Sequence, residues 1–187
     1  MEDLIFMCSM VRRPLGMELA LLGFLLRGPQ HGYQLHQMVS DPSGLGLIWN
    51  LKQSHLYALL SKLESDEYVI STLQNQDPHP PRKMFALTDA GRGIFFDWLT
   101  SPVTAPRLIR QDFFAKFFFA QRENKDTLQK LIETQRDVCQ NWVDVFKVKM
   151  EGSEQMSYNW LMYQFRLGQV QAIQSWLNSC EKTLNTP

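Results

Sequence analysis

The chain has 187 residues, of which 44% are hydrophobic and 20% are charged, so its composition is that of a folded globular protein. Its 19 Lys and Arg residues balance 19 Asp and Glu residues, so the net charge neither indicates nor excludes a polyanionic partner. No apolar stretch approaches the ~20 residues that span a bilayer, and the N-terminus lacks the basic region of a secretory signal. Three widely spaced Cys residues do not form a disulfide framework. We therefore expect a cytoplasmic protein without a metal site or cofactor.

Two breaks in composition divide the chain. Residues 1–16 precede a dense apolar stretch, so either they are an N-terminal extension or Met17 is the natural first residue. At residues 100–107, two prolines and several small polar residues stop any helix. We therefore predict a first domain at residues 17–99, a linker at 100–107 and a helical second domain at 108–187.

Three helices are predicted in the first part of the chain. The stretch 18–27 is apolar on almost every side, as expected for a buried helix in the middle of a small fold. A second helix is predicted at 31–39, followed by a glycine-containing loop at 43–50. In the third, at 53–65, four leucines follow the three- and four-residue steps of an amphipathic helix.

The periodicity then changes to that of strands. Residues 69–73 and 83–87 are short stretches with β-branched or aromatic side chains, which predicts a hairpin whose open tip is residues 74–82. Thr88 can cap a following helix through about residue 99. Three helices, a two-stranded hairpin and a further helix are the order of a winged helix-turn-helix, a mainly helical fold in which the hairpin is the wing.

The third predicted helix has a face suited to reading DNA. In winged helix-turn-helix proteins this helix lies in the major groove and the wing reaches the phosphate backbone or the minor groove. Opposite the leucines lie small and hydroxylated side chains, which permit close approach to base edges. The alternative is a surface that binds protein. The predicted DNA-binding residues are Lys52 just before the helix, Gln53, Ser54, His55, Tyr57, Ser61 and Lys62 on the helix, and Arg82 and Lys83 on the wing.

The charge of the first domain limits the strength of such binding. Residues 1–104 hold 8 Lys and Arg against 10 Asp and Glu, a net charge of −2, whereas strongly DNA-binding domains are usually basic. Any positive surface must therefore be local, and two copies of the domain would be needed for firm binding.

The second domain is predicted to bring two copies of the chain, and thus two DNA-binding domains, together. Two long amphipathic stretches, separated by a polar break at 151–154, predict an antiparallel helical hairpin. One hairpin cannot bury both wide apolar faces and its three Trp residues, so we expect a homodimer; the alternative is a bundle packed on the first domain. The predicted dimerisation residues are Leu128, Leu131, Val138, Trp142, Phe146, Trp160, Tyr163, Leu167, Val170 and Leu177.

Several short motifs resemble the PadR family of bacterial transcription regulators over residues 17–99. They include Gly32-Tyr33, Leu56-Tyr57 and Thr88-Asp89-Ala90-Gly91. The helical remainder is similar to the C-terminal domain of the virulence-activator-type subgroup. The resemblance implies a homodimer on a pseudo-palindromic operator in double-stranded DNA, most often a repressor, and some members are released from DNA by small aromatic or cationic molecules.

The chain departs from the family pattern at two points. Asp66-Glu67-Tyr68 stands where the family usually turns with glycine, so the helix end lacks its usual left-handed residue. Trp98 lies near the place where some members keep a tryptophan that stacks on a ligand, so it is a possible effector contact. The alternative for Trp98 is an anchor between the fourth helix and the C-terminal domain.

Catalysis has no support in the sequence. Neither a phosphate-binding loop nor a hydrolase or zinc-protease motif is present, and the four His residues lack metal-ligand spacing, so we predict that the protein is not an enzyme. The competing function is a winged-helix adaptor that binds protein without specific DNA binding. Salt dependence separates the two, because only phosphate contacts weaken steeply with salt.

Overall fold

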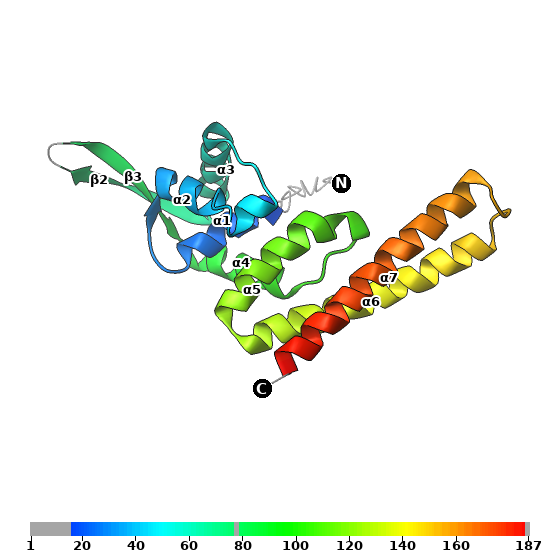
Figure 1. The fold of residues 1–187 in the computed structure, drawn as a ribbon. Helices are drawn as coiled ribbons and strands as arrows, with labels where there is room; N and C mark the ends of the chain where they lie inside the picture. The colour runs from blue at the N-terminus through cyan, green and yellow to red at the C-terminus, as the bar shows by residue number, and fades with distance from the viewer. Residues whose placement is uncertain (1–15, 77–78, 186–187) are drawn as a thin grey trace, which may run out of the picture.

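The computed structural model describes residues 16–76 and 79–185, so all but the last residue of the predicted extension at 1–16 lies outside the described part. Three helices form the first part of the fold (Figure 1), as the sequence predicts. The first is buried on nearly every side, as its composition requires. The third begins and ends where the leucine spacing predicts. Their bounds are Gly16–Leu25 (α1), Gly32–Val39 (α2) and Gln53–Ser65 (α3).

The predicted hairpin is present and is longer than expected. Strands β2 (Val69–Gln76) and β3 (His79–Leu87) pair antiparallel, with Thr72 opposite Met84 and Gln74 opposite Arg82. The predicted open tip at 74–82 is therefore wrong, because ladder hydrogen bonds extend the pairing through polar residues. A third strand, β1 (Gln30–His31), which the sequence did not indicate, joins the other edge of β3. Figure 1 shows β2 and β3 projecting away from the helices as a wing.

A left-handed residue ends α3, although it is not glycine. Glu67 has a φ of 60°, and the Tyr68 N–H donates to the Leu63 carbonyl at 2.9 Å, so the helix closes with the geometry that glycine usually provides. The Thr88 hydroxyl donates to the Glu67 carbonyl at 2.8 Å and accepts from the Gly91 N–H at 2.9 Å. Thr88 therefore caps the next helix, as predicted, and ties it to the end of α3.

The second half of the described chain is helical. Helix α4 (Asp89–Thr100) is followed by a short 3-10 turn, a π-helical turn and three α-helices. Helices α6 and α7 are long and antiparallel, as Figure 1 shows, so the predicted hairpin is present. No helix in the described residues is long and apolar enough to cross a membrane. The bounds of the last three helices are Phe114–Glu123 (α5), Lys125–Glu151 (α6) and Tyr158–Asn185 (α7).

The segment predicted as a linker, residues 100–107, is packed rather than free. Val103 is buried, and its N–H donates to the Gln135 side-chain oxygen at 2.7 Å. Gln135 is itself fully buried on α6. Helix α5 continues the core of the first domain, because Phe119 packs edge-on against Phe24 of α1 and Phe95 of α4. The two predicted domains therefore share one hydrophobic core.

Several predicted dimerisation residues are already buried inside one chain. Five of the ten are buried, so within one chain they hold the helical core together, whereas the other five keep some exposed surface. The prediction placed one apolar stripe on each helix but could not tell which partner covers it. Trp176 likewise packs on three Phe rings of the segment 113–117. The buried residues are Leu128, Leu131, Phe146, Val170 and Leu177, and Val138, Trp142, Trp160, Tyr163 and Leu167 are partly buried.

Candidate nucleic-acid interface

Helix α3 presents one polar face to solvent. Its four leucines are buried against the rest of the first domain, which fixes the rotation of the helix. The opposite face is exposed and carries amide, hydroxyl, imidazole and phenol groups but no acidic side chain. These are the donors and acceptors that read base edges in a major groove. The exposed residues of this face are Gln53, Ser54, His55, Tyr57, Ala58, Ser61 and Ser65.

A groove of about 620 Å³ lies between α2, α3 and the wing. Tyr57 of α3 packs against Gly32 at the start of α2, where a Cβ atom would lie 2.4 Å from the Tyr57 ring. Tyr33 is 55% exposed on one side of this groove, and Arg82 of the wing lines the other. The structure thus brings the polar face of α3 and the wing residue Arg82 to the same side of the molecule.

Lys62 lies at the edge of this face and forms an ion pair within the chain. Its ammonium group donates to both carboxylate oxygens of Glu18 in α1, at 2.7 and 2.8 Å. Glu18 is 3% exposed, so Lys62 compensates a charge that is buried in the core. This lysine therefore locks α3 onto α1, and little of its charge is available to a phosphate.

Lys83, on the wing, also forms an ion pair within the chain. Its ammonium group donates to the Glu64 carboxylate at 2.7 Å, and the Ser71 hydroxyl donates to the other oxygen of that carboxylate. Hydrogen bonds from Lys83 and Ser71 hold the pKa of the Glu64 carboxyl below its usual value. The three side chains join the last turn of α3 to both strands of the wing, so they set the angle between them.

Two of the predicted cations remain for phosphate contacts. Lys52, which precedes α3, and Arg82 on the wing are exposed and make no ion pair within residues 16–76 and 79–185. Phosphate contacts are made by such side chains, which position a protein on the duplex without reading its sequence. His55 and Ser54 lie next to Lys52 at the start of α3, where a recognition helix meets base edges.

The sequence did not single out the contribution of α2 to this surface. Tyr33, Gln34 and Gln37 line the groove beside Tyr57. The Gly32-Tyr33 pair was visible in the sequence, but nothing in its spacing showed that it faces α3. The signal that identifies these residues is the contact between Gly32 and the Tyr57 ring.

Trp98 does not line this groove and is buried in the last turn of α4. It is 8% exposed, and its indole N–H donates to the Asp112 carboxylate at 3.2 Å. The Lys116 ammonium group lies 5.4 Å from the centre of its ring. These contacts are those of an anchor between α4 and the helical second half, the alternative considered for Trp98 from the sequence.

Comparison with known proteins gives consistent matches. Residues 21–95 match the model of the transcriptional regulator PadR-like family. The chain is 25% identical over 144 residues, 75% of its length and 78% of the relative, to the negative transcriptional regulator PadR of Bacillus subtilis. A crystal structure of that protein with operator DNA has 23% identity and a TM-score of 0.45, covering 90% of this chain and 99% of the other. Its crystal structure with p-coumaric acid has a TM-score of 0.40 over 92% and 97% of the two chains, again at 23% identity.

Proposed function

The chain belongs to the PadR-like family of transcriptional regulators, and on that premise we propose that it is a sequence-specific DNA-binding repressor that acts as a homodimer in the cytoplasm. In this proposal α3 enters the major groove and the wing contacts the phosphate backbone or the minor groove. The regulator is not an enzyme. The family resemblance also implies a small aromatic effector, for which buried Trp98 is a poor contact.

One observation supports DNA reading more than any other. The exposed face of α3 carries polar, uncharged donors and acceptors, while its two flanking lysines differ in their contacts. Lys62 is held by Glu18, and Lys52 is exposed without an ion pair among the described residues. A surface of this kind has base-reading groups at its centre and positive charge at its edge, as protein–DNA interfaces do.

The proposed homodimer uses a face of α7 that the hairpin leaves exposed. Tyr158, Leu161 and Phe165 are 80%, 43% and 66% exposed and follow one another along this face. Gly168 continues the same stripe and leaves a hollow beside Phe165. Because a two-fold interface repeats each contact, Phe165 of one copy can fill the hollow beside Gly168 of a second. The partner that fits this stripe is a second copy of the chain. We therefore assign the dimer interface to this stripe and not to those predicted dimerisation residues that are buried inside the hairpin.

The test is binding of purified protein to the duplex upstream of its own gene and to a scrambled duplex, by fluorescence anisotropy over a salt series. Preferential binding that weakens steeply with salt is expected. Equal, weak binding to both duplexes would require a selection from random duplexes. Failure to enrich any sequence in that selection would leave the protein-binding adaptor as the function.

Two sets of variants separate the recognition of bases from contacts with the phosphate backbone. Ser54→Ala and Tyr57→Phe are expected to relax the preference at particular base pairs by about 1–3 kcal/mol. Arg82→Gln is expected to weaken binding to all sequences alike and to lower the salt slope by about one. Arg107→Gln, at an exposed position outside the interface, is the matched control. An unchanged base preference in both α3 variants would remove this helix from its reading role.

A further inference from the structure

The wing has two faces, and one of them packs on α3. Side chains alternate across a strand, so Val69, Ser71 and Leu73 of β2 share one face, which we call the inner face of the wing. Val69 is buried, and the Ser71 hydroxyl donates to the Glu64 carboxylate in the last turn of α3. Leu73 therefore continues, toward the wing tip, the face of β2 that contacts α3.

The inner face is buried at Val69, half-buried at Ser71 and exposed at Leu73, which is 73% exposed. Because a strand rises about 3.3 Å a residue, Leu73 lies roughly 7 Å closer to the wing tip than Ser71. Its partner across the hairpin is Lys83, whose ammonium group donates to the Glu64 carboxylate at 2.7 Å. An apolar side chain thus stands exposed beside α3, and the cation opposite it is already paired.

The inner face adjoins the exposed face of α3. Ser61 lies one helical turn before Glu64, so its exposed side chain is next to the contact that holds the wing. A duplex lying along the exposed face of α3 would extend past Ser61 and meet the wing at Leu73. The leucine therefore belongs to the same continuous surface as the groups proposed to read bases.

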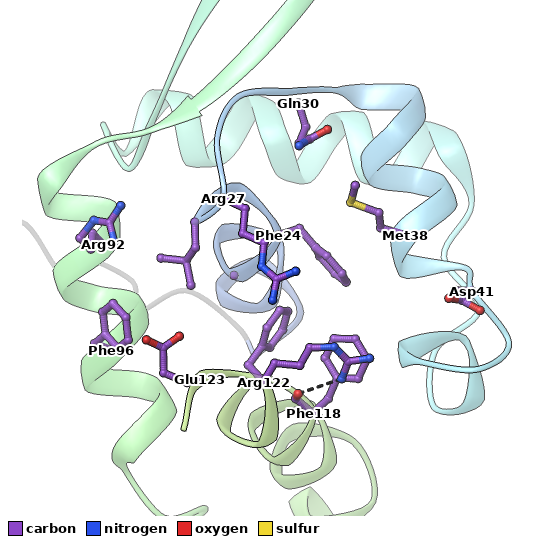
Figure 2. Close-up of a pocket in the computed structure, with 13 residues that line it drawn as sticks. Phe24, Arg27, Gln30, Met38, Asp41, Arg92, Phe96, Phe118, Arg122 and Glu123 are labelled. Atoms are coloured by element: carbon purple, nitrogen blue, oxygen red, sulfur yellow. Dashed lines mark hydrogen bonds between the residues drawn. The ribbon is translucent and has the colours of Figure 1, made fainter. Parts of the chain in front are cut away.

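The inner face of the wing is separate from the cavity shown in Figure 2. That cavity, of about 460 Å³, lies where α1, α2, α4 and α5 meet. Its described lining includes Phe24, Met38 and Phe118 but no residue of α3, β2 or β3. Substitution of Leu73 therefore leaves the packing between the first domain and the helical second half unchanged.

A DNA duplex offers an exposed leucine two kinds of apolar surface. Deoxyribose carbons form the walls of the minor groove, where several DNA-binding proteins place apolar side chains, whereas the thymine methyl group lies in the major groove. Phosphate oxygens require donors or cations, which a leucine lacks. Because α3 fills the major groove in the proposed function, the apolar surface left for Leu73 is that of the adjacent sugars.

We propose that Leu73 packs against deoxyribose carbons at the edge of the minor groove next to the major groove that α3 occupies. This inference rests on the proposed function, and it assigns the inner face of the wing to the minor groove and not to the phosphates. The contact is apolar, so the affinity that it adds does not depend on the release of counterions. The Lys83–Glu64 pair serves the same contact, because it neutralises a carboxylate that would otherwise repel the nearby phosphates.

The test compares Leu73→Ala with Ile70→Ala, which shortens an apolar side chain on the other face of the same strand. Ile70 is 56% exposed, so both substitutions alter the surface and not the core. Binding is measured by fluorescence anisotropy over a salt series, with the duplex upstream of the protein's own gene or the duplex enriched by selection. We expect Leu73→Ala to raise the Kd about fivefold or more with an unchanged salt slope, and Ile70→Ala to bind like the unchanged protein.

Two further measurements locate the contact on the duplex. A duplex with deoxyuridine in place of every thymidine lacks the thymine methyl groups and keeps all its sugars, so the effect of Leu73→Ala should persist in it. Hydroxyl radicals attack the deoxyriboses from the minor groove. Footprinting with them should show sugars beside the α3 site that the unchanged protein protects and that Leu73→Ala leaves open.

A conservative variant guards against a folding defect. Leu73→Met keeps an apolar side chain of similar volume and should retain the affinity, and thermal unfolding of Leu73→Ala should match that of Ile70→Ala. Full affinity of Leu73→Ala overturns the proposal, and so does an effect that disappears in the deoxyuridine duplex, which would place the leucine against a thymine methyl group. In both cases the unchanged protein still binds DNA, whereas failure of the proposed function would appear as no enriched duplex for the unchanged protein and would remove this contact with it.

Discussion

The Lys62 ammonium group donates to both carboxylate oxygens of Glu18, at 2.7 and 2.8 Å, and so joins the recognition helix to the helix at the centre of the fold. The two residues are 44 positions apart in the chain. The carboxylate is buried, whereas the lysine side chain is 33% exposed. The pair therefore orients α3 on α1, and the rotation of the DNA-facing surface depends on it.

Substitution of Lys62 is expected to act on stability first. Lys62→Ala removes two hydrogen bonds to a buried carboxylate and should lower the free energy of unfolding by about 1–3 kcal/mol. Lys52→Ala, at an exposed position without an ion pair among the described residues, should change stability by less than about 0.5 kcal/mol and weaken DNA binding instead. Urea denaturation of both variants checks this. Equal stability of the two proteins would contradict an orienting role for Lys62.

The turn after α3 offers a stabilising substitution. Glu67 has a φ of 60°, a conformation that costs a non-glycine residue about 1 kcal/mol or more. Glu67→Gly keeps the carbonyl that accepts from Thr88 and should raise the free energy of unfolding by about 1 kcal/mol. Asp66→Gly, at a φ of −84°, is the control and should bring no such gain. Thermal unfolding of the two variants measures the difference, and a loss of stability in Glu67→Gly would show that the Glu67 side chain is needed.

The sequence predicted the elements whose periodicity is strong. The leucine spacing gave the bounds of α3, and the Thr88 cap was read from a threonine followed by an acidic first turn. Strand β1 has two residues and therefore no period to detect. The outer part of the wing was missed because Gln74 and Gln76 are polar, so alternation of apolar and polar residues does not mark them as strand.

Partners distant in sequence could not be predicted. A helical wheel places Lys62 at the edge of the DNA-facing side, but it does not show that Glu18 of another helix binds it. The same limit applies to Leu131 and Val170, whose spacing indicates a buried face without indicating whether the same chain or a second copy covers it. Both questions are decided by long-range packing, which one sequence does not reveal.

Dimerisation is expected to depend on the exposed stripe of α7. Phe165→Asp places a charge at the centre of this apolar stripe and should convert the dimer to monomer at micromolar concentration. Gln171→Asp introduces the same charge at another exposed position of α7 and should leave the dimer intact. Sedimentation velocity distinguishes the two states. A dimer that persists in Phe165→Asp would move the interface to another surface.

Lys116 predicts a pH dependence of stability. Burial, opposed by the charge of Asp112, lowers the pKa of this lysine from 10.5 to about 8. Between pH 8 and 10.5 the unfolded chain therefore binds more protons at this site than the folded one, and stability gained from this site rises with pH. The difference in unfolding free energy between the unchanged protein and Lys116→Met should shift by about 1–3 kcal/mol in favour of the unchanged protein over this window. Urea denaturation of both proteins over this pH range measures the difference. If their unfolding free energies change with pH in parallel, Lys116 does not have the lowered pKa.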